Sequence, residues 1–245
     1  MIGSALHALD GNIGHADDLL FDDKTWTLRY VVVKTGGLLN RKRVLISPLG
    51  VAKVEWANHA LDLNLTQSQI EASPDVDTDK PVFREMESRY FDYFGWPYYW
   101  TDASIWGIDS RNPLIAGNRT SDRSTETDSH LRSCRAVSGY AVEAEDTRFG
   151  HVEDFLFEEG TWTIRYLLVD TKNWLPSKPV LISPKWVHSI DWNGQSIRVD
   201  LTKKAIEESP RLEPASPLKR SYEEKLHHHY HRPQYWHGED PSRRK

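Results

Sequence analysis

The sequence is nearly devoid of cysteine: Cys134 is the only one in 245 residues. A single thiol excludes an intrachain disulfide and any metal site built from several thiolates. Such sparing use of cysteine is typical of a reducing compartment, so we expect the chain to be cytoplasmic.

Long apolar runs and an excess of positive charge are also missing. No run approaches the roughly 18 apolar residues of a membrane span, and the first residues lack the pattern of a signal peptide. We therefore expect no membrane span. The net charge of -5 and the pI near 6.1 argue against binding to the phosphates of nucleic acids.

The common motifs of catalysis and cofactor binding are absent too. The sequence contains no Gly-rich phosphate loop, no dinucleotide fingerprint and no paired-cysteine motif, and Gly36-Gly37 is interpreted as a loop between strands. These absences predict a protein that is not an enzyme and that has no cofactor.

What the sequence does have is an internal repeat rich in aromatic residues. It contains ten Trp and ten Tyr, so large side chains supply much of the apolar surface. Position i matches position i+136 without a gap from Gly3 and Gly139 to Trp100 and Trp236. About 37 of the 98 aligned pairs are identical, which indicates a duplication.

The duplication predicts the domain organisation. We expect a first module at 1–100, a polar linker at 101–129, a second module at 130–236 and a flexible C-terminus at 237–245. The linker is rich in Ser, Thr, Asp, Asn and Arg and has little apolar periodicity. His130 to Val137 have no counterpart ahead of the first repeat.

Short runs that alternate apolar and polar residues between turn formers predict antiparallel strands. In the first repeat they lie at 5–8, 15–21, 26–34, 43–46, 51–56 and 61–65. Six short strands without a long helix favour a closed barrel, because closure removes exposed strand edges. The expected fold class is mainly β: two small antiparallel β-barrels in tandem, each followed by short C-terminal helices.

The turn after Phe21 predicts which residues face each other. If it is centred between Asp23 and Lys24, Asp18 lies opposite Arg29. The equivalent turn of the second repeat then places Asp154 opposite Arg165, so two structural ion pairs are expected. The same register predicts one core face, made of Leu19, Phe21, Trp26, Leu28, Tyr30 and Val32 in the first repeat.

Two short helices are expected after the strands of each repeat. Thr66 and Gln69 form the pattern of a capping box, and the helix that they begin must end by Pro74. Thr202 and Pro210 repeat this arrangement. The second helices are expected at 84–94 and 220–230.

An aromatic tail follows, with eight aromatic side chains between Tyr90 and Trp100. Exposed, it would form a large apolar patch. We expect it to fold back over its own module; the alternatives are docking on the other module or on a second chain, so a homodimer is expected. The interface candidates are Tyr90, Tyr93, Trp96, Tyr98, Tyr99, Trp100, Tyr235 and Trp236.

Four blocks of the repeat carry a resemblance to a known family. They are Gly-His before an acidic strand, Thr-Trp-Thr-x-Arg-Tyr, Val-Leu-Ile-Ser-Pro and a final Pro-x-Tyr-Trp. Both halves resemble the PRC-barrel family, which is named for the cytoplasmic domain of the photosynthetic reaction centre H subunit. The family also includes the C-terminal domain of a ribosome-maturation factor. The resemblance implies two PRC-type β-barrels used for protein contacts, with no catalytic residues to carry over.

Histidines are the candidates for chemistry. His227 and His231 would share one helix face at i and i+4 and could hold zinc or nickel. A catalytic metal needs a third ligand, and both residues fall in the tail helix, so they are weak candidates and no metal site is predicted. His15 and His151 could act as general bases, although hydrogen bonds to the backbone explain them equally well.

The leading hypothesis is a non-catalytic adaptor or assembly protein, with roles like those of the reaction centre H subunit as one setting. An RNA- or ribosome-associated binding module, like that of the maturation factor, is the alternative; the acidic charge argues against it. A metal-dependent activity through the tail histidines is the second alternative.

Overall fold

In a computed structural model, the residues described are 1–35, 43–74, 82–100, 130–171, 179–212 and 218–236. They form two compact units: unit 1 contains 1–137 and 157–165, and unit 2 contains 138–156 and 166–245. The predicted linker at 101–129 and flexible end at 237–245 lie outside the described residues. The module boundaries predicted from the repeat stay predictions.

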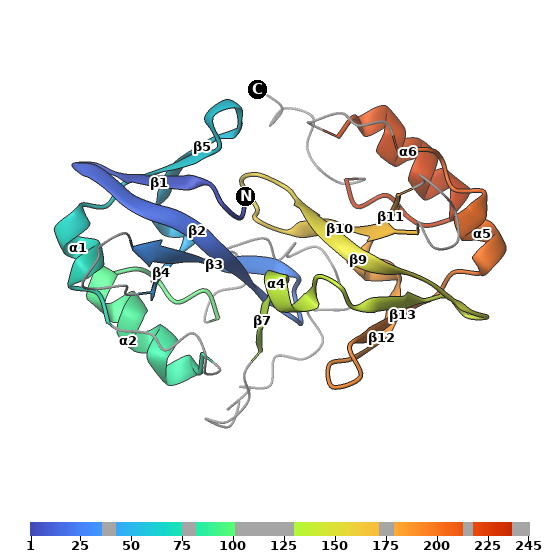
Figure 1. The fold of residues 1–245 in the computed structure, drawn as a ribbon, viewed down its shortest axis with the longest axis horizontal. Coiled ribbons are helices and arrows are strands. Elements are labelled where there is room, and N and C mark those ends of the chain that lie inside the picture. The colour runs from blue at the N-terminus through green and yellow to red at the C-terminus, as the bar shows by residue number, and fades with distance from the viewer. Residues whose placement is uncertain (36–42, 75–81, 101–129, 172–178, 213–217, 237–245) are drawn as a thin grey trace. The chain divides into compact units, whose positions relative to one another are not determined.

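Unit 1 is built on one curled sheet in which the strands follow the order β4-β3-β2-β1-β6-β5 (Figure 1). These strands confirm the six predicted for the first repeat. β3 and β4 are buried along nearly their whole length, so both of their faces are covered. Their bounds are β1 Ala5–Ala8, β2 Gly11–Asp22, β3 Thr27–Thr35, β4 Arg43–Ile46, β5 Val51–Glu55 and β6 Ala60–Leu63, with 3₁₀ turns η1 Pro48–Gly50 and η2 Trp56–Asn58.

Unit 2 contains the strands of the second repeat in the equivalent order β11-β10-β9-β8-β13-β12. Its sheet curls into a half-barrel, so the fold class is mainly β as predicted. The bounds are β8 Ala141–Glu143, β9 Arg148–Phe157, β10 Ile164–Asp170, β11 Val180–Ile182, η3 Pro184–Trp186, β12 Val187–Asp191 and β13 Ser196–Val199. The turn residues 157–165 are grouped with unit 1, where Thr163 bridges Thr27.

One pairing in each sheet departs from the antiparallel prediction. β1 lies parallel to β6, with Leu6 beside Leu61, and β8 lies parallel to β13, with Val142 beside Ile197. The reason lies between β4 and β5, where the 3₁₀ turn η1 continues the chain without reversing it. The final strand therefore returns beside the first strand in the same direction.

The register between β2 and β3 also differs from the prediction. Asp18 lies opposite Val32, and Leu20 lies opposite Tyr30. The turn is longer than predicted because Trp26 adopts a left-handed conformation with φ 54°, and two irregularities interrupt the ladder along β2. A bulge of this kind shifts every later pair.

The predicted ion pair between Asp18 and Arg29 is therefore wrong. Arg29 instead pairs with Asp22, with 4.0 Å between Nε and Oδ2. In the second repeat Arg165 likewise pairs with Glu158, the equivalent of Asp22, and not with the predicted Asp154.

The predicted core face is largely confirmed. Leu19, Phe21, Leu28, Tyr30 and Val32 are buried, and Trp26 is half-buried. Both faces of β3 are covered, because the intervening Val31 and Val33 are buried as well.

The helices confirm the predicted pattern. Thr66 caps α1 (Gln67–Glu71) through a capping box with Gln69, and Thr202 caps α5 (Lys203–Glu207). The longer helices are α2 (Arg84–Phe94) and α6 (Arg220–His229). In the described part of the chain no helix has the length and apolarity needed to cross a bilayer.

A strand that the repeat did not predict completes the sheet of unit 1. β7 (Leu131–Ser133) pairs antiparallel with the end of β2, and the short helix α4 (Cys134–Val137) follows it. We call residues 130–137 the strap. It precedes the second repeat in sequence, yet it belongs to unit 1.

Candidate functional site

A buried carboxylate organises the interior of unit 1. Glu87 of α2 is only 1% exposed. Its Oε1 accepts hydrogen bonds from the hydroxyls of Tyr30 at 2.9 Å and Tyr99 at 2.5 Å. Its Oε2 accepts one from Nη1 of Arg84 at 2.9 Å. Both oxygens are therefore satisfied inside the protein, as a buried charge requires.

The same four-residue network recurs in unit 2, 136 positions later. Glu223 of α6 accepts hydrogen bonds from the hydroxyls of Tyr166 at 3.1 Å and Tyr235 at 2.7 Å. Arg220 donates to its other oxygen at 2.9 Å. All four members are identical between the repeats, so the network is part of the common fold.

The network connects the sheet, the helix and the tail of each unit. In unit 1 the sheet contributes Tyr30, α2 contributes Glu87, and the tail contributes Tyr99. The Arg84 guanidinium also lies 4.3 Å from the ring centroid of Trp100, a favourable cation–π contact. Each tail thus folds back over its own unit, as predicted.

Burial and a histidine set the electrostatics of the network in unit 1. Burial raises the pKa of Glu87 to about 7, against the opposing effect of Arg84. Nε2 of His130 lies 2.9 Å from the Tyr99 hydroxyl and 3.5 Å from Oε2 of Glu87. Burial lowers the pKa of His130 to about 4, which favours the neutral imidazole beside the carboxyl group of Glu87.

A second buried cation lies beside this network. Arg29 is 3% exposed, and its guanidinium lies 4.0 Å from the ring centroid of Tyr99. Its Nη2 donates to the Thr25 hydroxyl at 3.3 Å. Burial lowers the pKa of Arg29, and the nearby Asp22 counteracts this effect.

The two histidines considered as metal ligands do not lie on one helix face. His227 is 2% exposed; its Nδ1 donates to the Pro233 carbonyl at 2.9 Å, and its Nε2 lies 2.9 Å from the Tyr166 hydroxyl. α6 ends at His229, and His231 has a left-handed φ of 51°. Over the described ranges, no group of three or more His, Cys, Asp or Glu is placed to hold a metal.

The other two histidines lie on strands. His15 is exposed on β2. His151 lies on β9 with its Nε2 4.0 Å from the Asp170 carboxylate, and it lines an open hollow of about 470 Å³ together with Arg148 and Phe149.

The aromatic candidates for an interface differ in exposure. Tyr90, Tyr99 and Trp236 are buried inside their own units, so they belong to the core. Tyr93 is 42% exposed. The half-buried ones are Trp96, Tyr98, Trp100 and Tyr235.

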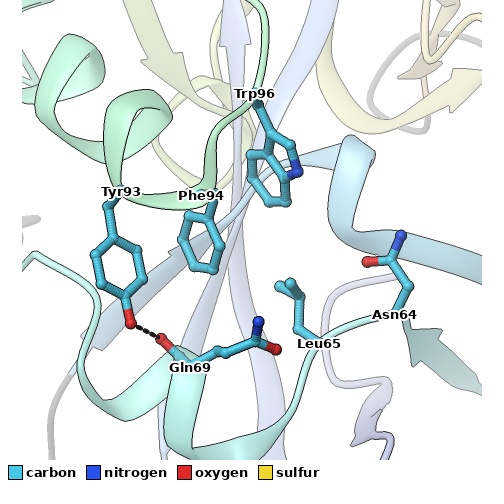
Figure 2. A pocket seen from close by; sticks show the side chains of 6 residues that line it. All are labelled: Asn64, Leu65, Gln69, Tyr93, Phe94 and Trp96. Carbon is cyan, nitrogen blue, oxygen red and sulfur yellow. Dashed lines mark hydrogen bonds between the residues drawn. The ribbon is translucent and has the colours of Figure 1, made fainter.

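Figure 2 shows the hollow of about 390 Å³ that part of this tail lines, with Phe94 and Trp96 on one side and Leu65 and Gln69 on the other. The Phe94 and Trp96 rings stack at 4.5 Å, and the Tyr93 hydroxyl donates to the Gln69 carbonyl at 2.9 Å.

The equivalent place in unit 2 carries different side chains. Arg232 stands at the position of Trp96 and donates to the Asp200 carbonyl at 2.6 Å. His229 donates to the Ala205 carbonyl at 2.7 Å and thereby keeps the hydrogen bond that Tyr93 makes in unit 1. The hydrogen bond from the helix to the carbonyl of α1 or α5 is thus retained, while the tryptophan that the tail contributes in unit 1 is replaced by an arginine in unit 2.

Sequence reasoning missed the Glu87 and Glu223 networks. The signal was available, because all four members of each network are among the identical pairs of the repeat. Glutamate in a helix is usually exposed, and nothing local in the sequence indicates that these two are buried.

The fold and the interior network together define a mainly β protein whose two sheets each hold a helical, aromatic tail. The family model of the PRC-barrel domain matches residues 132–206, which run from β7 to α5 in the second repeat. No curated protein matches the chain.

Proposed function

We propose that the chain is a tandem PRC-barrel protein that binds and assembles other proteins and catalyses no reaction. The family match at 132–206 supports this for the second repeat. For the first repeat the support is the gapless i+136 pattern together with the equivalent strand order of the two sheets.

The observation that carries the proposal is that the buried glutamates bind residues of their own unit. A catalytic acid or base must reach a substrate, whereas Glu87 and Glu223 are each surrounded by two tyrosine hydroxyls and an arginine of their own unit. The burial of these two glutamates and their hydrogen bonds serve to attach a tail. The outer surfaces are then left for contacts with other molecules.

A homodimer remains part of this proposal. The exposed Tyr93 and the half-buried Tyr98 are the tail residues that a second chain could contact. Sedimentation velocity of the full chain measures the oligomeric state. The protein concentration is varied from roughly 1 to 100 µM, which spans the dissociation constants of weak dimers. A mass that stays that of one chain contradicts the dimer.

The test of the function is chemical cross-linking of the tagged full chain in lysate of its own host, followed by affinity capture. We expect a second protein in near-stoichiometric amount with cross-links to the outer face of a sheet. Recovery of the chain alone, combined with consumption of a metabolite from the same lysate by the purified chain, would contradict a non-catalytic binding role. Recovery of RNA with a steep salt dependence would point to the ribosome-associated alternative.

A further inference from the structure

The two units pack an indole against the same position at the end of their longer helix, but from different residues. In unit 1 the indole is that of Trp96, whose ring centroid lies 4.5 Å from that of Phe94. In unit 2 it is that of Trp186 in η3, with 5.0 Å between its centroid and that of Tyr230, the equivalent of Phe94. Trp186 stands where unit 1 has Gly50, the glycine that the Trp96 ring covers. The tail residue of unit 2 therefore extends in another direction.

That tail residue is Arg232, and its guanidinium donates to the Asp200 carbonyl at 2.6 Å. The backbone at this contact is paired in the same way in both units. The Asp200 N–H donates to the Trp186 carbonyl at 2.9 Å. The N–H of Asn64, the equivalent of Asp200, donates to the Gly50 carbonyl at 3.0 Å. The Asn64 carbonyl is thus the equivalent in unit 1 of the acceptor that Arg232 uses.

The two tails also leave their helices alike. The Trp96 N–H donates to the Phe91 carbonyl at 3.0 Å, and the Arg232 N–H donates to the His227 carbonyl at 2.9 Å. From this common backbone, the side chain of Trp96 turns to Gly50 and carries no guanidinium. The place that Arg232 fills in unit 2 is therefore not filled by the tail of unit 1.

The hollow of about 390 Å³ lies at this place, because Asn64 and Trp96 both line it. Figure 2 shows aromatic side chains on one side and the residues that follow β6 on the other. Trp96 is half-buried, so part of its ring is accessible. A guanidinium stacks on aromatic rings and donates to carbonyl oxygens. The residues described around the hollow carry no formal charge, so none of them repels a cation.

We propose that this hollow binds an arginine side chain of a partner protein, which takes the place that Arg232 fills in unit 2. The inference rests on the proposed protein-binding function and names the residue that the partner contributes. The guanidinium donates to the Asn64 carbonyl and lies against the Trp96 ring. Lysine fits less well, because its ammonium group is more strongly hydrated and lacks the planar fork of donors.

Titration of the isotope-labelled full chain with N-acetyl-arginine methylamide tests the site by NMR. The indole N–H signal of Trp96, assigned by its loss in Trp96→Phe, should shift saturably at millimolar concentrations together with the side-chain amide of Asn64. The citrulline analogue has the same shape without the charge. It should bind at least about fivefold more weakly, because it loses the attraction between a cation and the ring. Equal affinities for both analogues, or signals of Trp96 and Asn64 that do not move, would overturn the proposal.

A double variant transfers the arrangement of unit 2 to unit 1. Gly50→Trp with Trp96→Arg supplies the indole and a resident arginine, so the unit should still unfold cooperatively in urea. Its affinity for the arginine analogue, followed by the Asn64 signal, should fall at least about tenfold, because a tethered arginine competes at high effective concentration.

Ser189→Arg is the matched control. Ser189 is exposed in unit 2, and its replacement adds the same charge, so the affinity should change less than about twofold. Unchanged affinity in a folded double variant refutes the site. If the double variant does not fold, the comparison of the two analogues on wild type decides.

The capture experiment separates this inference from the proposed function. A partner that wild type and Ser189→Arg retain and the double variant loses supports both. A protein captured equally by all three leaves the binding function standing and refutes the hollow as its site. Binding of the analogue with no protein captured contradicts a protein partner and makes free arginine the ligand.

Discussion

Two buried groups of unit 1, Glu87 and His130, change the free energy of unfolding with pH in opposite directions. Replacing His130 separates the two effects. Burial raises the pKa of Glu87 from 4.5 to about 7. Between those values the folded protein retains a proton that the unfolded chain has released. The free energy of unfolding therefore falls with rising pH by about 1.4 kcal/mol per unit, or roughly 3 kcal/mol over the interval.

His130 contributes the opposite slope. Burial lowers its pKa from 6.5 to about 4, so between those values the unfolded chain binds a proton that the folded protein does not. The free energy of unfolding then rises with pH by the same about 1.4 kcal/mol per unit. In the wild type the two slopes cancel between pH 4.5 and 6.5.

Two single variants show separately how Glu87 and His130 contribute to the pH dependence of the free energy of unfolding. Relative to wild type, His130→Gln should lose stability as pH rises from 5 to 6.5, by about 2 kcal/mol. Glu87→Gln should gain stability over the same range, and the double variant should again run parallel to wild type. Differences between variants remove the contributions of all other carboxyl groups.

The assay is urea unfolding of the full chain at pH 5, 5.5, 6 and 6.5, with His188→Gln as the control. His188 is an exposed histidine of unit 2, so its replacement shows what the loss of a histidine outside the buried network does. A His130→Gln variant whose stability runs parallel to wild type between pH 5 and 6.5 would refute the lowered pKa of the buried His130.

Three further predictions concern single contacts. Tyr235→Phe removes one of the two hydroxyls on the buried carboxylate of unit 2 and should lower the free energy of unfolding by about 1–2 kcal/mol in urea. Gly14→Ala should lower the melting temperature in calorimetry by about 5 °C or more, because its Cβ would lie 2.2 Å from the Lys34 carbonyl oxygen at a φ of +131°. Asp18→Ala should speed alkylation of the buried Cys134 at least tenfold by releasing the strap; an unchanged rate would contradict that attachment.

The strands and helices could be predicted because local patterns determine them. The alternation of apolar residues marked each strand of the first repeat to within a few residues, and the Thr66 capping box marked the start of α1. The cross-strand register could not be predicted in the same way. It depends on the left-handed Trp26 and on two bulges in β2, and neither leaves a periodic signal.

The strap and the buried network could not be predicted from local sequence patterns, because both depend on residues that are distant in sequence. His130 to Val137 were recognisable as an addition to the second repeat, but only tertiary structure shows that they complete the sheet of unit 1. The burial of Glu87 depends on Tyr30 and Tyr99, which are distant in sequence.

The packing that follows from differences in side-chain size between the repeats could not be predicted either. Unit 1 has Gly50 where unit 2 has Trp186, and the tail residue Trp96 reaches over Gly50, 3.2 Å from where a Cβ would stand. In unit 2 the buried indole of Trp186 comes from η3, and the tail has Arg232 instead of a tryptophan. Each unit thus packs one indole near this place from a different part of the chain.

The attachment of each tail to its own sheet through a buried glutamate is tested most directly by amide hydrogen exchange of the full chain carrying Glu223→Ala. Faster exchange throughout α6 and residues 233–236, with exchange in α2 unchanged, is the predicted result, because α2 is held by its own carboxylate. Unchanged exchange in α6 would show that the glutamate does not hold the tail and would contradict the structural role assigned to both networks.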